Sequence, residues 1–236
     1  MRLGLLLLWA AGMLAPPQTA LAQAGPILLD DFESYRAGDL PTQWHAQLNG
    51  ELVPLTTQFF DDQEWFETRR EGGNGYVRAY TNSETVHLSM ANKQDFEWDT
   101  TTHPVLAWEW RAIQLPDGAR EDRDSLNDSG AGIYVILAVD GRIIRRPRII
   151  KYVYSSTLPV GTVASYGRLK VLVVASALDG TGEWLSMERN VAEDHQRLYE
   201  EAAPRHPLVI RLWADSDNSS SVATADFDNV RLLPRR

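Results

Sequence analysis

Polar and hydrophobic residues alternate with a period of two along much of the chain. The segment Val105–Ile113 places Trp108 and Trp110 on one side. It places Glu109 and Arg111 on the other side. Because successive side chains of a β-strand point to opposite faces, this alternation predicts a strand with one buried face. The sequence therefore predicts a protein built mainly from β-strands.

Further segments show the same alternation or a short apolar run, and turn residues separate most of them. The predicted strands are Ile27–Phe32, Tyr76–Tyr80, Thr85–Met90, Val105–Ile113, Gly132–Val139, Arg148–Tyr154, Leu169–Ala175, Trp184–Asn190, Leu208–Ala214 and Thr224–Leu232. The pair Asp140-Gly141 predicts a hairpin. The polar stretch Asp117–Gly130 predicts a long surface loop. One helix is predicted over Ala192–Ala203, ended by Pro204.

About ten strands and a single helix predict an all-β fold. We expect a jelly roll or β-sandwich of two antiparallel sheets, with one short helix near the C-terminus. No internal repeat or linker divides the chain, so one domain is expected over residues 23–236.

Residues 1–22 have the pattern of a signal peptide rather than of an element of the fold. Arg2 gives a positive start, an apolar stretch follows, and the ALA sequence at 20–22 matches a small-x-small cleavage pattern. The apolar run is interrupted by two prolines and is too short to span a bilayer. We expect cleavage between Ala22 and Gln23 and export of the protein. The absence of cysteine suits the periplasm, where free thiols are oxidised.

Composition narrows the classes of partner. The 236 residues include 32 acidic and 23 basic side chains, giving a formal net charge of −9. This balance argues against binding nucleic acid, which needs clustered Lys and Arg, and against docking on anionic lipid. No later stretch is long and apolar enough to span a membrane. A chain without cysteine has no disulfide, thiolate nucleophile or Cys-ligated zinc. Nothing in the sequence fixes an oligomeric state.

Three segments carry a resemblance to a known family. They are 105–111 (VLAWEWR), 152–163 (YVYSSTLPVGTV) and 213–232 (WADSDNSSSVATADFDNVRL). In order and spacing they resemble an uncharacterised exported bacterial family, domain of unknown function 3047. The resemblance implies a jelly-roll-like sandwich and no established activity. This chain departs from the family in having Glu109 where a basic residue is usual between the two tryptophans.

The two ends of the predicted fold resemble those of carbohydrate-binding jelly rolls. In such proteins the terminal strands lie side by side, and acidic groups there often hold a structural calcium. The matching acids are Asp31, Glu33, Asp226 and Asp228. Calcium takes six to eight oxygen ligands, which converging carboxylates supply, so we expect a structural Ca²⁺ site at these four residues. The alternative is that they are acidic strand ends in water.

A second acidic cluster occurs in the loop 215–221. Asp215, Asp217 and Ser219 have the alternate spacing of a calcium-binding loop. The loop lacks the glycine and the terminal glutamate of an EF-hand. Asp and Ser also build turns by bonding their own backbone, and we prefer that interpretation.

Charged residues on the predicted outward sides of several strands are candidates for binding a ligand. We expect them on one outer or concave face beside tyrosines: Arg78, Glu109, Arg111, Lys151 and Arg211. The plainer alternative is a set of solvated strand faces with cross-strand ion pairs. Trp65 lies in an acidic stretch and is the best candidate for an exposed aromatic that stacks on a sugar ring.

Three functional hypotheses follow. The first is an exported, non-catalytic binding protein with a glycan as the leading ligand. The second is a carbohydrate-active enzyme, a hydrolase or lyase, in which Glu109 acts with a second acid such as Glu183 or Glu188. The third is a structural or partner-binding envelope protein. The histidines have no metal-ligand spacing, and no nucleophile elbow or phosphate loop is present.

Overall fold

Two β-sheets face each other in the computed structural model, which describes residues 24–141 and 144–235. The predicted signal peptide and its cleavage site lie outside these residues. Within them, no helix has the length and hydropathy that crossing a membrane requires.

The strands of each sheet follow a fixed order. Sheet A runs β12 (Leu185–Asn190), β7 (Val105–Gln114), β14 (Val222–Leu233), β5 (Asn74–Asn82) and β4 (Glu64–Glu71), and β1 (Ile27–Asp30) also pairs with β14. Sheet B runs β10 (Val163–Tyr166), β11 (Leu169–Ser176), β9 (Arg146–Ser155), β8 (Ala131–Asp140), β13 (Val209–Asp215), β6 (Thr85–Ala91), β2 (His45–Leu48) and β3 (Glu51–Pro54). Helix α1 is Val191–Tyr199, and short 3-10 helices occur at Thr57–Phe59, Asp124–Leu126 and Ala177–Asp179.

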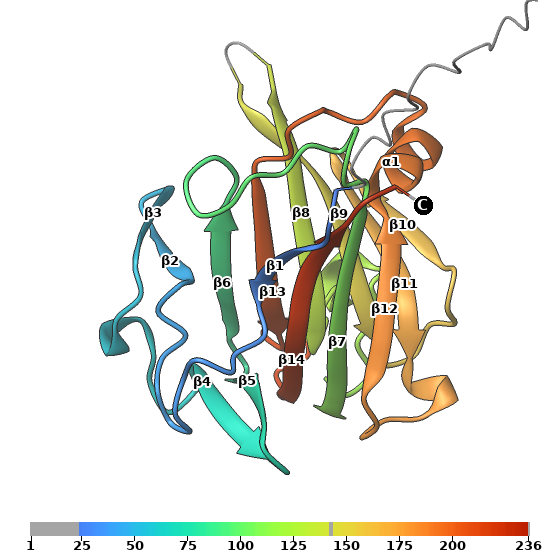
Figure 1. Cartoon of the computed structure of the whole chain (residues 1–236). Coiled ribbons are helices and arrows are strands. Elements are labelled where there is room, and N and C mark those ends of the chain that lie inside the picture. The colour runs from blue at the N-terminus through green and yellow to red at the C-terminus, as the bar shows by residue number, and fades with distance from the viewer. Residues whose placement is uncertain (1–23, 142–143, 236) are drawn as a thin grey trace, which may run out of the picture.

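This architecture confirms the predicted all-β sandwich with one short helix near the C-terminus. Figure 1 shows β7, β12 and β14 of sheet A in front of β8 and β9 of sheet B. Neighbouring strands of the described chain pair antiparallel, except that β9 and β11 run parallel. Strand β1 lies antiparallel to β14, with Ile27 opposite Leu232. The first and last strands are therefore side by side, as expected.

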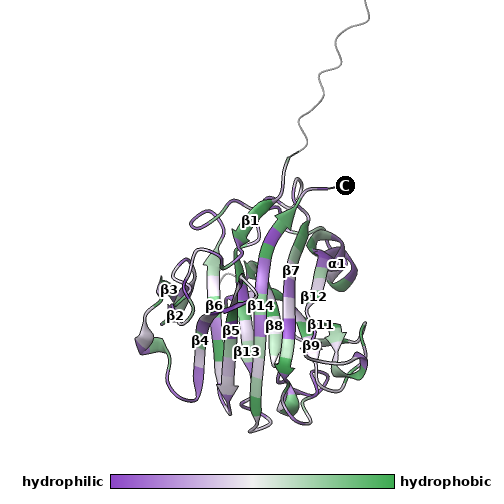
Figure 2. Cartoon of the chain, turned by 60° about the horizontal axis from the view of Figure 1, so that its bottom comes forward, coloured by the Kyte–Doolittle hydropathy of each residue, from purple (hydrophilic) through white to green (hydrophobic). Residues whose placement is uncertain are grey.

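The core fills the space between the sheets. Trp108 and Trp110 of β7 are 1% and 0% exposed, and Trp110 packs against Phe227 of β14. The residues that alternate with them on β7, Glu109 and Arg111, face outward as their alternation predicts. Figure 2 shows hydrophilic and hydrophobic positions alternating along β7 and β14. This alternation gives each sheet one inner and one outer face.

The predicted hairpin at Asp140-Gly141 connects β8 to β9. Asp140 lies opposite Arg146 in the register of the two strands. Gly141 has a φ of 90°, and a Cβ added there would lie 2.2 Å from the carbonyl oxygen of Ile144. Only glycine fits this turn without a backbone shift.

Helix α1 is shorter than predicted. It ends at Tyr199 because Glu200 turns into the left-handed region, with a φ of 59°, and its N–H donates to the carbonyl of Gln196. His195 is fully buried and stacks on Tyr199. The buried residues of the helix are Val191, Asp194 and His195, so polar as well as apolar side chains face the sandwich.

The prediction of a surface loop over Asp117–Gly130 is partly wrong, because part of this segment is buried against the outer side of sheet B. Glu121 is 1% exposed and accepts a hydrogen bond of 2.6 Å from the Ser155 hydroxyl of β9. The Tyr166 hydroxyl of β10 donates to the Glu121 carbonyl at 2.9 Å. One end of the outer side of sheet B is thereby covered.

Candidate functional site

The structure divides the predicted ligand-binding residues between two opposite outer faces. Those on sheet A are Trp65, Arg78, Glu109 and Arg111, from β4, β5 and β7. Lys151 of β9 and Arg211 of β13 are on sheet B. We call the two sets of outward side chains the sheet-A face and the sheet-B face. The expectation that all these charged residues lie on one face is therefore wrong.

A saturated ion-pair network occupies the sheet-A face. Asp226 is fully buried and lies opposite Arg78 on one side and Arg111 on the other. Its carboxylate accepts bonds of 2.6 and 2.9 Å from Arg78 and of 2.9 and 2.7 Å from Arg111. Arg111 also pairs with Glu71 at 2.9 Å. This is the plainer alternative foreseen for strand faces, cross-strand ion pairs.

Aromatic rings on the same face are also engaged within the protein. The Arg111 guanidinium lies 4.8 Å from the ring centre of Trp184 and 5.4 Å from that of Tyr76. Trp65 is partly exposed and stacks on Tyr80, with ring centres 5.2 Å apart. These contacts engage part of the aromatic surface of this face within the protein.

The four acids predicted to hold calcium have separate partners. Asp226 is bound by the two arginines, and Asp31 accepts from the Glu33 N–H at 3.2 Å. Glu33 itself accepts from the Gly75 N–H, and Asp228 accepts from the Asn74 amide at 2.8 Å. The residues are therefore not assembled as one set of ligands. Calcium binding at them remains a prediction.

Three other carboxylates do converge, at one end of sheet B. In the described chain, Asp128, Asp215 and Asp217 can place one oxygen each within 4.8 Å of one another. Asp128 accepts the backbone N–H groups of Asn218 and Ser219 at 3.1 and 2.6 Å. These bonds from outside the loop hold the turn that follows β13.

Glu109 lies beside an acid of β14, and the predicted partner Glu188 is on the neighbouring strand β12, opposite Ala107. The acid across the strands from Glu109 is Asp228, and Glu109 accepts bonds from Ser186 at 3.2 Å and Asn229 at 3.4 Å. Burial raises the pKa of Asp228 to about 6, with the charges of Glu109 and Glu33 adding to the rise. A carboxyl that is partly protonated near neutral pH beside a second carboxylate is the pairing that acid catalysis requires.

The sheet-B face is built from strands β6, β13, β8 and β9. Its central side chains are His87, Ser89, Tyr134, Lys151, Arg211 and Trp213. One row across the sheet is formed because Arg211 lies opposite both Ser89 and Tyr134, and Tyr134 lies opposite Lys151. In the next row Trp213 lies opposite His87 and Gly132. The register thus gathers aromatic and polar groups at the centre of the sheet.

Trp213 forms the centre of an aromatic platform. Its ring stacks on His87, with centres 4.8 Å apart and planes 11° apart. On the other side the Tyr134 ring centre is 4.5 Å away. Both Trp213 and His87 are partly exposed. Burial and the charge of Arg211 lower the pKa of His87 to about 4, so the imidazole is neutral at neutral pH.

Several polar groups of this face have no hydrogen-bond partner among the described residues. They are His87 Nε2, Ser89 Oγ, Arg211 Nε and Trp213 Nε1. Arg211 makes one bond, from Nη2 to the side-chain amide oxygen of Gln47 at 2.8 Å. Buried polar groups in folded proteins are normally paired, so a cluster of unpaired ones calls for an explanation.

A buried charge cluster borders the platform. Lys151 is 1% exposed, and its ammonium lies 5.2 Å from the Tyr134 ring centre. Burial opposes its charge, but Tyr134, Asp215 and Glu121 outweigh that effect and raise the pKa of Lys151. Burial raises the pKa of Asp215 to about 6, against the effect of Lys151. No ion pair of the described chain includes Lys151 or Arg211, but the charges of Asp215 and Glu121 act on Lys151, whereas no carboxylate acts on Arg211 in this way.

A cavity of about 160 Å³ opens beside the platform. Its lining includes Gln47, Phe59, Glu64 and His87. Burial, together with the charges of nearby acids, raises the pKa of Glu64 to about 7. The cavity continues the polar and aromatic character of the sheet-B face toward strand β4.

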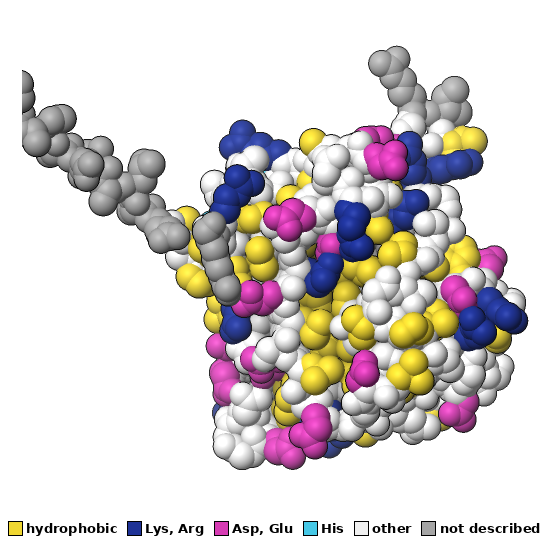
Figure 3. All heavy atoms as spheres, turned by 90° about the vertical axis from the view of Figure 1, so that its right-hand side faces the viewer, with side chains coloured by type: hydrophobic (Ala, Val, Ile, Leu, Met, Phe, Trp, Pro, Cys, Tyr) yellow, Lys and Arg dark blue, Asp and Glu magenta, His cyan; other side chains and the backbone are white. Residues whose placement is uncertain are grey.

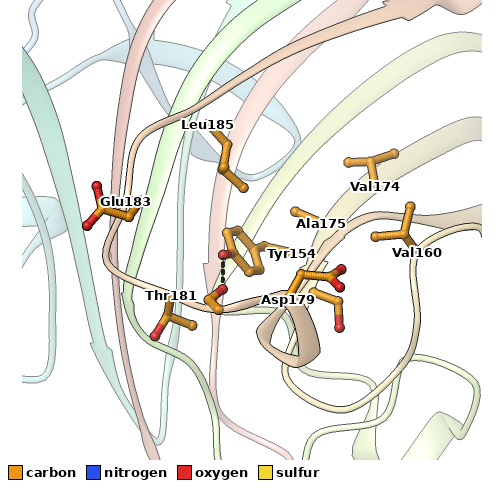
Figure 4. Close-up of a pocket in the computed structure, with 10 residues that line it drawn as sticks. Tyr154, Val160, Val174, Ala175, Asp179, Thr181, Glu183 and Leu185 are labelled. Atoms are coloured by element: carbon orange, nitrogen blue, oxygen red, sulfur yellow. Dashed lines mark hydrogen bonds between the residues drawn. The ribbon is translucent and has the colours of Figure 1, made fainter.

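A second cavity, of about 210 Å³, lies at the side formed by β11 and β12. Figure 4 shows Tyr154 at its centre, donating to the Gly180 carbonyl, with the apolar Val174 and Leu185 nearby. Glu183 lies at its rim and points away from Tyr154. Figure 3 shows hydrophobic side chains gathered over this side of the molecule. The cavity is mainly apolar and brings no second acid to Glu109.

Sequence reasoning missed the platform as a unit. The alternation of β13 placed Arg211 and Trp213 together on one side, and the same argument put His87 outward on its own strand. What the sequence did not reveal was that β6 and β13 are neighbours. This pairing brings Trp213 and His87 into contact.

Comparison with known proteins gives a family. A family model described as a protein of unknown function, DUF3047, matches residues 53–231. No curated protein matches the sequence.

Solved structures with a similar fold include two carbohydrate-binding modules of Clostridium thermocellum cellulases. The family 11 module of Lic26A-Cel5E has 8% identity and a TM-score of 0.46, with 89% of this chain and 95% of that one covered. The family 30 module of Cel9D-Cel44B has 11% identity and a TM-score of 0.37, with 89% and 94% covered. An exo-beta-agarase has 11% identity and a TM-score of 0.45; the match covers 89% of this chain and 25% of the agarase. At these identities the likeness concerns the fold alone.

Proposed function

Because the chain belongs to the DUF3047 family, whose description names no activity, we propose from the geometry that it is an exported, non-catalytic protein that binds a glycan on its sheet-B face. The observation that supports this most is the Trp213 platform surrounded by polar groups without partners in the described chain. The sheet-A face is a poorer candidate, because its charges are already paired with one another.

The chemistry of a sugar ring matches such a surface. A pyranose has an apolar C–H face and a rim of hydroxyls, so it needs a flat aromatic surface with donors and acceptors around it. Trp213 supplies aromatic surface where the rings of His87 and Tyr134 leave it exposed. Arg211 and Gln47 supply polar groups next to it. The cavity beside His87 offers room for a second sugar unit or a substituent.

The proposed location follows from the N-terminal segment. The pattern of residues 1–22 supports export, and the absence of cysteine suits the periplasm. Glycans of the cell envelope or of the surroundings are accessible there.

Binding is tested with the mature chain on a broad glycan array, followed by calorimetric titration of the best ligand. Trp213→Ala should weaken binding about tenfold or more, because it removes the stacking surface. The matched control is Trp65→Ala, which removes the same side chain from the sheet-A face and should change affinity less than about twofold. Trp213→Phe keeps a ring and should restore part of the affinity if thermal melting shows that the alanine variant is destabilised. Absence of binding to any saccharide, or a loss confined to Trp65→Ala, contradicts the proposal.

A second candidate function is a carbohydrate-active enzyme that uses Glu109 with Asp228. The observation in its favour is the pKa of Asp228, raised to about 6 by burial beside Glu109. An enzyme of this kind turns over its glycan, and Glu109→Gln abolishes that turnover. The binding proposal expects intact glycan after prolonged incubation with the wild-type protein. Reducing-end assays on the ligands found by the array distinguish the two.

A further inference from the structure

Arg211 has no carboxylate partner among the described residues, unlike most of the half-buried arginines of the protein. Arg78 and Arg111 pair with Asp226, Arg148 pairs with Asp140, and Arg189 pairs with Asp194. No ion pair of the described chain includes Arg211. Its one bond goes to the neutral amide oxygen of Gln47.

The acids nearest to this face are already used. Asp215 accepts the Thr85 hydroxyl at 2.6 Å and lies in the field of Lys151. Glu121 accepts the Ser155 hydroxyl at 2.6 Å. Burial lowers the pKa of Arg211, and no carboxylate of the described chain opposes that effect. A desolvated guanidinium without a counter-charge is costly, and an anion that arrives with a ligand removes that cost.

The groups around Arg211 are also suited to an anion. The Ser89 hydroxyl lies directly opposite Arg211 in the strand register, and the Trp213 indole N–H is in the adjacent row. Neither group has a hydrogen-bond partner in the described chain. Both are hydrogen-bond donors buried within the protein, and donors beside an unpaired cation favour a carboxylate or sulfate oxygen over a second cation.

We propose that the glycan of the sheet-B face is acidic, and that Arg211 pairs with its anionic group while the adjoining sugar ring packs against the exposed part of the Trp213, His87 and Tyr134 rings. This inference rests on the proposed function and specifies its ligand class. The anionic group is the carboxylate of a uronic acid or the sulfate ester of a sulfated sugar. The two share the same charge and hydrogen-bonding chemistry at Arg211.

The experiment compares each acidic polysaccharide with a neutral copy of itself. Polygalacturonate, alginate and hyaluronan are titrated alongside their carboxyl-reduced forms, in which each uronate has become a hexose. A sulfated galactan and its desulfated form make the second arm. The wild-type protein should bind the acidic form of at least one pair about tenfold or more tightly than its neutral copy.

Variants assign the preference to Arg211. Arg211→Gln should bind the acidic form no better than the neutral one, whereas Arg211→Lys should keep part of the preference, because it keeps the charge but loses the two-pronged geometry. The control is Arg231→Gln on β14, which removes the same charge from sheet A, where Arg231 has no ion pair in the described chain. It should keep the full preference.

The outcomes separate this inference from the proposed function. Equal binding of acidic and neutral forms, or binding of neutral glycans alone, overturns the acidic ligand and leaves the glycan-binding face in place. A preference that survives Arg211→Gln overturns the role of Arg211. Failure to bind any polysaccharide or array glycan overturns both proposals. Thermal melting of each variant, with Arg211→Lys as the milder change, shows that a loss of binding is not a loss of folding.

Discussion

Replacing Asp226 by asparagine should destabilise the protein by removing the charge at the centre of the sheet-A face. The carboxylate is 0% exposed and accepts from two guanidinium groups whose side chains are 24% and 13% exposed. An asparagine side chain has the same shape, but its amide would present N–H groups to at least one guanidinium. Two arginines would then lose their shared counter-charge, although Arg111 keeps Glu71.

The expected cost is about 3 kcal/mol. Breaking a fully buried pair costs about 3–5 kcal/mol, and the partial exposure of both arginines reduces that figure. For a chain of this length the change corresponds to a fall in melting temperature of roughly 6–12 °C. Urea unfolding followed by far-UV circular dichroism measures the free energy of unfolding directly, and the dependence on urea concentration should be unchanged.

Two controls show whether the network itself is responsible. Glu67→Gln breaks the more exposed pair with Arg69 on β4 and should cost less than about 0.5 kcal/mol. The triple variant Asp226→Leu, Arg78→Met, Arg111→Met removes all the charges together and should recover most of the stability lost in Asp226→Asn. A cost below about 1 kcal/mol for Asp226→Asn would refute the structural role assigned to this network.

Three further predictions concern titration and metal binding. The pKa of Asp228 is raised from 3.8 to about 6, so the folded state holds its proton more tightly than the unfolded chain, and stability falls as pH rises through this window. Between pH 4 and pH 8 in urea titrations, Asp228→Asn should therefore gain about 1–2 kcal/mol of stability relative to wild type, after allowance for solvent screening. Parallel pH profiles of the two proteins would contradict this. The pKa of His87 is lowered from 6.5 to about 4, so stability is lost as pH falls through this range. In His87→Phe the melting temperature should fall less between pH 7 and pH 5 than in the wild type. An equal fall in the two proteins would count against this prediction. If calcium binds at Asp31, Glu33, Asp226 and Asp228, a hundredfold excess of calcium over Kd should stabilise the protein by about 2.7 kcal/mol relative to a sample with chelator. An unchanged melting temperature would contradict this prediction.

The alternation of side chains predicted the architecture well because it needs only local information. It placed Trp108 and Trp110 in the core and Glu109 outside before any strand partner was known. Strands β2 and β3 were not predicted because four residues carry little periodicity. Strand β4 was not predicted because its exposed end is polar on both sides.

The candidate site was less accessible to sequence reasoning because it depends on which strands are neighbours. Arg111 and Arg211 look alike in the sequence, each on a strand with alternating residues. Long-range pairing places Arg111 beside Asp226 and Arg211 beside the neutral Ser89 and Tyr134. One guanidinium is thus neutralised and the other has no counter-charge in the described chain, a difference that only the register reveals.

The central claim is that the ligand lies on the sheet-B face, over Trp213. The most direct test is an NMR titration of the ¹⁵N-labelled protein with the best glycan, observing the indole N–H signals and assigning that of Trp213 from the Trp213→Phe variant. The account predicts that this signal shifts with the binding curve, while those of Trp65 and Trp184 at the sheet-A face stay in place. Shifts confined to Trp65 or Trp184, with Trp213 unmoved at saturation, would contradict it.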